Sequence, residues 1–560
     1  MLIRLFCLAS CVLSAAFVEA DEIRDMQTQA IETKHCDAVH WGVDSSRYSS
    51  WTSHSNRLIP VYAFGTKGAG EGIDLDSYTG ENSPYRDPQK VQHLYQSDVQ
   101  TSLDSEATYM DQTNIFDLEL AAVEAGKKHV FLVVFDGMDW PTTRIAAIYN
   151  EQKVSYDEGR GTGTHFQEYQ AGGTTQYGWM VTSPYRDGAQ VDVNSQRVKN
   201  PGSGLPGGYN AQIAGRYPWS LATVPEYLIA GPRDALVRHA YTDSATSATS
   251  MNCGVKSYNG AIGVTYEGRP QPSVAHLAQA AGYKIGVVTS VPISHATPAA
   301  TYSHNVSRND YQDITRDLLG LPSVSHPEQA LQGVDVLIGA GFGVDTDSDR
   351  GQGENFVVGN KYLTDQDLKA IDMDHGGNYS VALRTEGVAG KDTLTAAVNK
   401  AIENKTRLFG FYGVYGFGGS NDGHLPYASA DGAYDPAPGV SGGPIEYSEG
   451  DVQENPKLAE MTTAALAVLE ATDKPFWMMV EAGDVDWANH DNNIDNSIGA
   501  VNSGDAAVKV ITDWVEKNSS WEESVLIVTA DHGHYMMIDH PELLIRPTQP
   551  VTESTDESSK

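Results

Sequence analysis

The stretch HVFLVVFDG at residues 129–137 is the part of the sequence that decides the fold. It is a short, continuous run of β-branched and aromatic residues that ends in Asp136 and a glycine. Runs of this kind, apolar on both faces, are typical of buried parallel strands. Four other runs share the pattern: YKIGVVTS (283–290), DVLIGAG (335–341), FWMMVEAGD (476–484) and SVLIVTADH (524–532). We therefore expect a mostly parallel sheet.

Helical patterns separate these runs. PSVAHLAQAAG (272–282) and PKLAEMTTAALAVLEAT (456–472) place apolar residues at helical spacing, and each begins at a proline. Alternating strands and helices predict an α/β fold with a central, mostly parallel sheet, helices on both faces and a site at the carboxyl ends of the strands. Residues 150–235 and 411–455 break the pattern, so they are either insertions near the site or disordered.

The N-terminal segment of the chain predicts export. Residues 1–20 combine Arg4, an apolar run and a small-residue cleavage site, which is typical of a removable signal peptide. We expect a secreted or periplasmic protein, with lipid attachment at Cys11 as the alternative. Residues 21–546 are expected to form one domain without a transmembrane segment, and residues 547–560 a disordered tail. The sequence leaves open whether Cys36 and Cys253 pair.

The net charge limits the partners. The chain has 560 residues and a formal charge of −35, so nucleic acids and anionic membrane surfaces are not expected to bind it. A site for anions in such a chain needs strong local positive charge, which bound metal ions supply.

Several residues at the ends of the expected elements can carry chemistry. Ser244, in HAYTDSATSAT, is expected to follow a short strand and to begin a helix, where backbone N–H groups stabilise anions. Thr297 follows the strand 283–290, and Arg308 lies further along, with a guanidinium that can clamp two phosphate oxygens. An N-cap serine and a surface arginine are the plainer readings.

Two later segments offer metal ligands. Glu481, Asp486 and His490 follow the strand at 476, and Asp486 and His490 share a face if the segment is helical. Asp531 and His532 end the strand at 524. Burying this many ionisable groups without metal ions would be costly.

The segments FDGM, TDSATSAT, HATPAATYSHNVSR, VEAGDVDWANH and TADHGH resemble, in order and local spacing, the signature segments of alkaline phosphatases. The resemblance implies hydrolysis of phosphate monoesters through a phosphoserine on Ser244, with Arg308 holding the phosphoryl oxygens. It also implies two zinc ions and one magnesium ion. The implied ligands are Asp486 and His490 for the first zinc, Asp136, Asp531, His532 and Ser244 for the second, and Asp136, Thr297 and Glu481 for magnesium.

The first zinc of this family takes another histidine from a late segment, and His534 and His540 lie too close to TADH to supply it. WTSHSNRLIPVYAFGTKGAG (51–70) looks like that late segment, and YMDQTNIFDLELAA (109–122) resembles the closing helix of the family. We therefore expect a circular permutation in which residues 35–125 replace the usual C-terminal part. His54 then completes the first zinc site; alternatively, it is a surface residue of an extension.

Two rival functions remain. One is a phosphodiesterase or sulfatase of the same superfamily; the other is a secreted protein that binds metal or phosphate without turnover. His295 and Trp487 replace residue types found in other members, so we expect both near the substrate and expect them to affect metal preference and phosphate affinity. The resemblance also suggests a homodimer.

Overall fold

The computed structural model describes residues 22–96, 100–204, 207–231, 239–414, 423–545 of the chain. The predicted signal peptide and C-terminal tail lie outside these residues. A ten-stranded sheet forms the centre of the fold, in the order β14-β15-β11-β10-β16-β4-β17-β2-β5-β3. The strands, in that order, are Tyr379–Leu383, Arg407–Phe411, Val336–Ala340, Lys284–Pro292, Phe476–Ala482, His129–Phe135, Ser524–Thr529, Ile59–Phe64, Gln176–Val181 and Met110–Asp111.

The strands from β14 to β17 run parallel, and β2 is antiparallel to both of its neighbours, β17 and β5. The predicted strands at 129, 283, 335, 476 and 524 are confirmed as β4, β10, β11, β16 and β17. These strands are almost wholly buried, as their uninterrupted apolar runs require. The predicted fold class is therefore confirmed.

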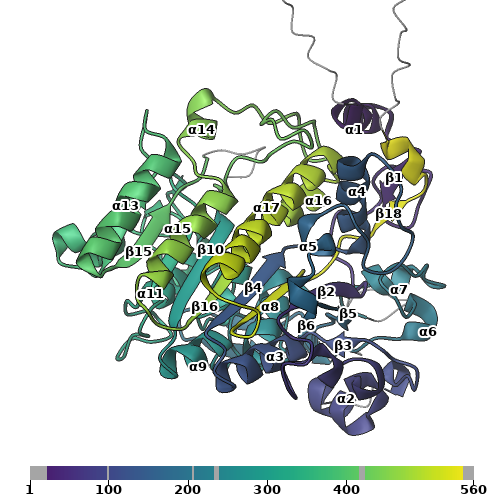
Figure 1. Ribbon diagram of the computed structural model, residues 1–560, viewed down its shortest axis with the longest axis horizontal. Helices are drawn as coiled ribbons and strands as arrows, with labels where there is room; N and C mark the ends of the chain where they lie inside the picture. The colour runs from purple at the N-terminus through teal and green to yellow at the C-terminus, as the bar shows by residue number, and fades with distance from the viewer. Residues whose placement is uncertain (1–21, 97–99, 205–206, 232–238, 415–422, 546–560) are drawn as a thin grey trace, which may run out of the picture.

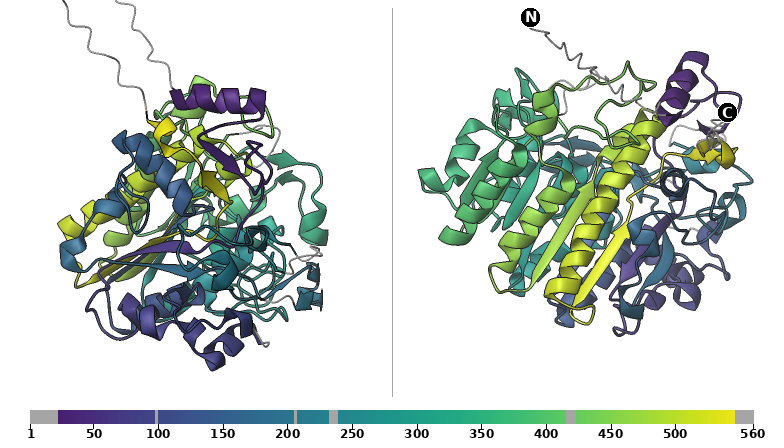
Figure 2. Two further views of the ribbon diagram at one scale, coloured as in Figure 1. Left: turned by 90° about the vertical axis from the view of Figure 1, so that its right-hand side faces the viewer. Right: turned by 45° about the horizontal axis from the view of Figure 1, so that its top comes forward.

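Helices cover both faces of this sheet. One layer holds α4 (Trp140–Glu151), α13 (Gly390–Asn404), α15 (Leu458–Glu470) and α17 (Ile494–Asn518), which pack side by side (Figure 1). In the right-hand view of Figure 2 the green and yellow helices of this layer lie in front of the strands. The other layer holds α3 (Thr113–Glu124), α8 (Ser244–Cys253), α9 (Val274–Ala280) and α10 (Ala296–Ala300).

The remaining helices are shorter or peripheral. They are α1 (Glu22–Thr33), α2 (Pro88–Tyr95), α5 (His165–Glu168), α6 (Ala211–Ala214), α7 (Glu226–Ile229), α11 (Tyr311–Leu319), α12 (Asp365–Ile371), α14 (Glu449–Gln453) and α16 (Asp484–His490). Four two-stranded sheets lie outside the centre: β1 (Val39–Trp41) with β18 (Met536–Ile538), β6 (Arg186–Asp187) with β9 (Ser203–Gly204), β7 (Gln190–Asp192) with β8 (Arg197–Asn200), and β12 (Asp345–Thr346) with β13 (Gly359–Asn360).

The structure differs from the sequence-based expectation in two places and answers one question that the sequence left open. The stretch 150–235 contributes β5 to the central sheet, so it is more than an insertion. Residues 239–243, before Ser244, form no strand. Cys36 and Cys253, whose pairing the sequence left open, are free thiols.

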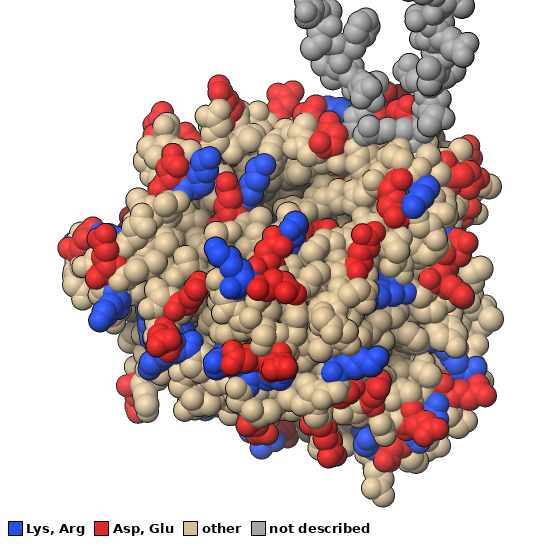
Figure 3. Space-filling model, in the orientation of Figure 1, with Lys and Arg blue, Asp and Glu red and all other residues tan. Residues whose placement is uncertain are grey.

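Charge is dispersed on the face shown in Figure 3, where acidic and basic side chains are interspersed. Within the described residues, no helix combines the length and apolar character needed to cross a membrane.

Candidate metal centre

Three neighbouring parallel strands bring their acidic residues to one edge of the sheet. In the register of β4 with β16 and β17, Val134 lies beside both Glu481 and Thr529. Asp136 follows β4, and Asp531 follows β17 by two residues. Because the carboxyl ends of parallel strands meet at one edge, residues almost 400 positions apart in the sequence become neighbours.

The first group of possible metal ligands comprises Asp136, Asp531 and His532. The Nε2 atom of His532 lies 3.3 Å from Asp136 Oδ1 and 3.3 Å from Asp531 Oδ2. The backbone N–H groups of Gly137 and His532 donate to the other Asp531 oxygen, each at 2.9 Å. Asp136 Oδ1 and Asp531 Oδ2 accept no hydrogen bond within the part of the chain that the structure describes. Two buried, unsatisfied carboxylate oxygens fit a cation.

The raised pKa values of the two carboxyl groups in this first group are consistent with a cation-binding site. Burial, and then the negative charges of Asp531 and Asp486, raise the pKa of Asp136 well above its ordinary value. Burial raises the pKa of Asp531 to about 7. Neighbouring carboxylates in an apolar setting resist ionisation, and a bound cation removes that cost.

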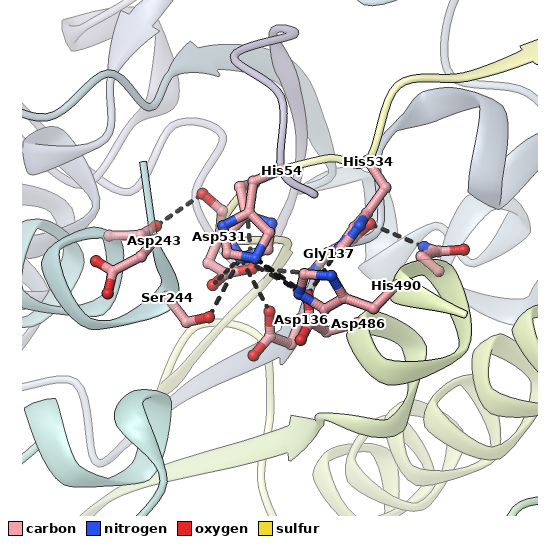
Figure 4. Close-up of polar contacts among 12 residues, drawn as sticks. His54, Asp136, Gly137, Asp243, Ser244, Asp486, His490, Asp531 and His534 are labelled. Atoms are coloured by element: carbon pink, nitrogen blue, oxygen red, sulfur yellow. Dashed lines mark hydrogen bonds and ion pairs between the residues drawn. The ribbon is translucent and has the colours of Figure 1, made fainter. Parts of the chain in front are cut away.

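The second group comprises His54, Asp486, His532 and His534, with His490 beside it (Figure 4). Asp486 and His490 lie on α16, as predicted for residues four apart on a helix, and His490 Nε2 is 3.5 Å from Asp486 Oδ1. His54 Nε2 lies 3.7 Å from the same oxygen. Burial raises the pKa of Asp486, but the nearby His490, His534 and His54 outweigh it and hold that pKa well below its usual range.

Backbone carbonyls fix the orientation of two of these imidazoles. His54 Nδ1 donates to the carbonyl of Thr242 at 2.9 Å, and His490 Nδ1 donates to that of Thr52 at 2.6 Å. Both Nε2 atoms therefore face the centre, only 3.0 Å apart. Burial lowers the pKa of His54 well below its ordinary value, which favours the neutral ring. Neutral imidazoles held by outer carbonyls and turned toward a carboxylate are typical of zinc ligands.

His54 enters this group from the loop before β2. The backbone N–H of Ser55 donates to the carbonyl of Gly533 at 2.6 Å, which joins the loop to the segment after β17. The His54 ring stacks on His532 with ring centroids 3.8 Å apart. The structure thus places His54 beside Asp486 and His490, and not on the surface: its side chain is only 10% exposed.

Sequence reasoning set His534 aside, yet this residue lies in the second group. Its Nε2 atom is 2.6 Å from Asp486 Oδ1, and its ring is buried. Gly137 makes room for it: with φ of +73°, a Cβ there would lie 2.7 Å from His534 Nε2. The spacing of His532 and His534 was the available signal, because residues two apart in extended chain share a face.

Ser244 begins α8, the helix of small residues that packs against α3 and α10. Asp243 caps the helix by accepting the N–H of Thr246 at 3.0 Å. Ser244 is buried, with 2% of the residue exposed, and its hydroxyl lies 3.2 Å from His532 Nε2 (Figure 4). A hydroxyl beside both ligand groups and at a helix N-terminus faces an environment that favours anions.

Arg308 lies at the N-terminus of α8 because it is bonded to Asp243, the residue that caps this helix. Its Nη1 donates to Asp243 Oδ2 at 3.1 Å, and its side chain is 28% exposed. The carboxylate therefore both caps α8 and holds the guanidinium beside the helix N-terminus, where one face stays open to a ligand.

Glu481 and Thr297, the predicted magnesium ligands, are both buried. Glu481 accepts a hydrogen bond from the Thr289 hydroxyl through Oε2. Its Oε1 and the Thr297 hydroxyl oxygen have no partner of good geometry among the described residues. Burial raises the pKa of Glu481 to about 8, although the Thr289 hydroxyl opposes it. This uncompensated oxygen pair also fits a cation.

His295 and Trp487 belong to an aromatic cluster. Their ring centroids lie 5.4 Å apart, and His295 also stacks on Tyr311 at 5.7 Å. Trp487 is held edge-on by His424 at 4.6 Å. Because Trp487 directly follows Asp486 on α16, this cluster adjoins the second ligand group.

Comparisons with known proteins show which chains this one is similar to. The sequence model of the family described as alkaline phosphatase matches residues 224–358 and 442–554. The alkaline phosphatase of Escherichia fergusonii is 31% identical over 315 residues, covering 54% of this chain and 60% of the relative. The membrane-bound alkaline phosphatase of Bombyx mori is 28% identical over 327 residues, covering 52% of this chain and 50% of the relative.

Among solved structures, the cold-active alkaline phosphatase from Shewanella sp. aligns with a TM-score of 0.43 and 21% identity, covering 72% of this chain and 68% of that one. The fold and the site define an α/β protein with a candidate metal centre beside a helix-borne serine. Within that class, the chain is similar to the alkaline phosphatase family over the residues that the family model matches. It spans 60% and 50% of the length of the two curated relatives described above.

Proposed function

We propose that the protein hydrolyses phosphate monoesters to an alcohol and inorganic phosphate, with Ser244 as the nucleophile. The observation that carries the proposal is the position of the Ser244 hydroxyl, 3.2 Å from His532 Nε2 and at the N-terminus of α8. A phosphoryl group attached there would lie beside the helix N–H groups and within reach of both ligand groups.

The donor sets support two zinc ions and one magnesium ion. His54, Asp486 and His490 would hold the first zinc, with His534 as an additional donor; Asp136, Asp531, His532 and Ser244 would hold the second; Asp136, Thr297 and Glu481 would hold magnesium. When bound, such ions act as Lewis acids toward phosphoryl oxygens and lower the pKa of hydroxyl groups and water.

The residues of the chain have separate tasks in the two displacement steps. In the first step, the Ser244 oxygen bonds to phosphorus while the ester bond breaks and the alcohol leaves. In the second step, water breaks the bond between the Ser244 oxygen and phosphorus and releases inorganic phosphate. Arg308, held by Asp243, would bind the non-bridging oxygens in both steps.

The other predictions concern the chain as a whole. The central position of His54 and the place of β2 beside β17 support the proposal that residues 35–125 replace the usual C-terminal part of the family in a single permuted domain. The pairing of β1 with β18 brings the two ends of the described chain together, as a permutation requires. Export to the periplasm or exterior, and a homodimer, are proposed from the family resemblance.

The test is phosphate release from an aryl phosphate with Zn²⁺ and Mg²⁺ supplied. We expect turnover by the full chain, with acid-stable phosphate trapped on Ser244 after rapid acid quenching, and loss of both in Ser244→Ala. Ser250→Ala is the matched control, because its hydroxyl lies on the same helix but bonds only to the Thr246 carbonyl. Faster turnover of a phosphate diester or an aryl sulfate would favour a phosphodiesterase or sulfatase of the same superfamily. Metal binding without any turnover would favour the non-catalytic binding protein.

A further inference from the structure

A second group of imidazole and carboxylate side chains lies outside the candidate metal centre. His304, Asp317 and His326 bring one donor atom each to within 4.8 Å of one another. His304 follows α10, Asp317 lies near the end of α11, and His326 lies in the loop after α11. Nothing in the proposed phosphatase chemistry uses these side chains.

The hydrogen bonds of His304 fix which of its nitrogens can bind a ligand. Its Nε2 lies 2.8 Å from the carbonyl oxygen of Gln271, so Nε2 carries the proton and donates it. The lone pair of Nδ1 is then directed at His326 Nε2, 3.0 Å away. An imidazole with its outer nitrogen fixed by a carbonyl and its inner nitrogen turned toward other donors is the arrangement that metal-binding histidines adopt.

Asp317 is oriented in the same way. Its Oδ1 accepts the Ser323 hydroxyl at 2.6 Å, and its Oδ2 accepts the backbone N–H of His304 at 3.0 Å. The Oδ2 atom lies 3.9 Å from His326 Nε2. No lysine or arginine among the described residues pairs with this buried carboxylate, so its charge is uncompensated within that part of the chain.

Ser323 also fixes the loop that carries the third donor, because its hydroxyl oxygen accepts the backbone N–H of His326 at 3.0 Å. The His326 side chain is 18% exposed, whereas that of Asp317 is almost fully buried. The exposed side offers a path for an ion and a coordination position open to water.

We propose that His304 Nδ1, His326 Nε2 and the Asp317 carboxylate bind a Zn²⁺ ion, with water as the fourth ligand. Two imidazoles and one carboxylate are a donor set that zinc prefers, and three protein ligands with one open position are a known zinc arrangement. The ion would tie the segment between Thr297 and Arg308 to α11 and to the loop after it. The ordinary alternative is a hydrogen bond from His326 to His304 with no ion.

The test counts zinc in the full chain. The protein is stripped with a chelator, dialysed against a fixed free concentration of Zn²⁺, and its zinc content per chain is measured. We expect the wild type to hold one zinc ion more than either His326→Ala or Asp317→Asn. The control is His375→Ala, which removes an exposed histidine bonded to a single carboxylate, Asp372, and should leave the zinc content unchanged.

Each variant is first shown to keep a wild-type melting transition in its zinc-free form, so that a lost ion cannot be a folding defect. Because Asp317→Asn keeps the shape of the side chain, it stays informative if His326→Ala does not fold. Wild-type zinc content in either folded variant would overturn the proposal. Since the count does not depend on turnover, this result is separate from the fate of the phosphatase proposal.

Discussion

The Nε2 atoms of His54 and His490 lie 3.0 Å apart, although the residues are separated by 436 positions in the sequence. In each ring the Nδ1–H group donates a hydrogen bond to a backbone carbonyl. Neither neutral ring therefore has a second N–H group that could form a hydrogen bond between the two Nε2 atoms. Two lone pairs at this distance repel unless a proton or a metal ion lies between them. This contact makes the proposed first zinc site the most direct target for mutation.

His54→Ala should weaken zinc binding at that site and reduce phosphate release. Loss of an outer partner of a metal ligand costs roughly 10–100-fold in metal affinity or activity, and loss of the ligand itself should cost at least as much. Zinc affinity and aryl phosphate turnover are measured together. His35→Ala is the control, because that side chain is exposed and bonds only to Asp37. Unchanged zinc affinity in His54→Ala would contradict the ligand role and weaken the case for permutation.

Arg308→Lys should impair phosphate binding nearly as much as Arg308→Ala. A lysine keeps the charge but cannot hold two phosphoryl oxygens and the Asp243 carboxylate in one plane. We expect about 1.5–3 kcal/mol of weaker binding, the usual range for a charge-assisted hydrogen bond. The measurement is inhibition by inorganic phosphate. Full retention of phosphate affinity in Arg308→Lys would show that charge alone matters.

Gly137→Ala should disturb the site far more than the same substitution at a glycine of similar backbone conformation away from the site. The new Cβ would lie 2.7 Å from His534 Nε2 and 3.0 Å from the Asp486 backbone. Gly126→Ala is a matched control, since Gly126 has φ of +79° but no atom within 4 Å of the new Cβ. Both variants should lose about 1–2 kcal/mol of stability from left-handed backbone, but only Gly137→Ala should lose activity. Equal activity losses would point to strain alone.

Without metal, the wild type should lose stability relative to Glu481→Gln as the pH rises from about 6.5 to about 8. Burial raises the pKa of Glu481 to about 8 and that of Asp531 to about 7. A carboxyl group with a raised pKa in the folded state stabilises that state while protonated, and the contribution is lost as the pH rises through that value. The buried histidines, whose pKa values are lowered by burial, act in the opposite direction near pH 6.5, because an unfolded histidine is still half charged there. Their contribution is the same in the wild type and in Glu481→Gln, so it cancels when the two are compared.

The expected loss is on the order of 1–2 kcal/mol for Glu481 alone over this range. Urea unfolding of chelator-treated protein at several pH values measures it, with Glu481→Gln as the comparison that should flatten the dependence. Saturating Zn²⁺ and Mg²⁺ should flatten it as well, because the carboxylates are then ionised at their cations. The same pH dependence in the metal-free wild type and in Glu481→Gln would contradict the uncompensated burial of Glu481.

Much of the fold and site could be predicted because the residues concerned obey a simple rule of sheet geometry. Asp136, Glu481 and Asp531 each sit at or after the end of a continuous apolar strand, and parallel strands bring such ends to one edge. Ser244 and the pair Asp486 and His490 depend only on local helix geometry. These positions follow from short segments of sequence.

The features that were missed depend on long-range contacts. The sequence of β5 contains a glycine and no clear apolar run, so no local pattern predicts a strand there. The segment is extended because it pairs with β2. His534 becomes a neighbour of Asp486 because Gly137 opens space for it, which no local pattern encodes. The grouping of His304 with Asp317 and His326 likewise depends on how the loop after α11 turns back.

The placement of β2 has a consequence for the order in which the chain can fold during synthesis. In the central sheet β2 lies between β5 and β17, and β17 comes far later in the chain than β2. Until β17 emerges, one edge of β2 has no final partner and the His54 ring lacks His532, on which it stacks. The site therefore forms only after the segment that carries β17 and His532 has left the ribosome, and a nascent chain must keep that apolar edge from aggregating meanwhile.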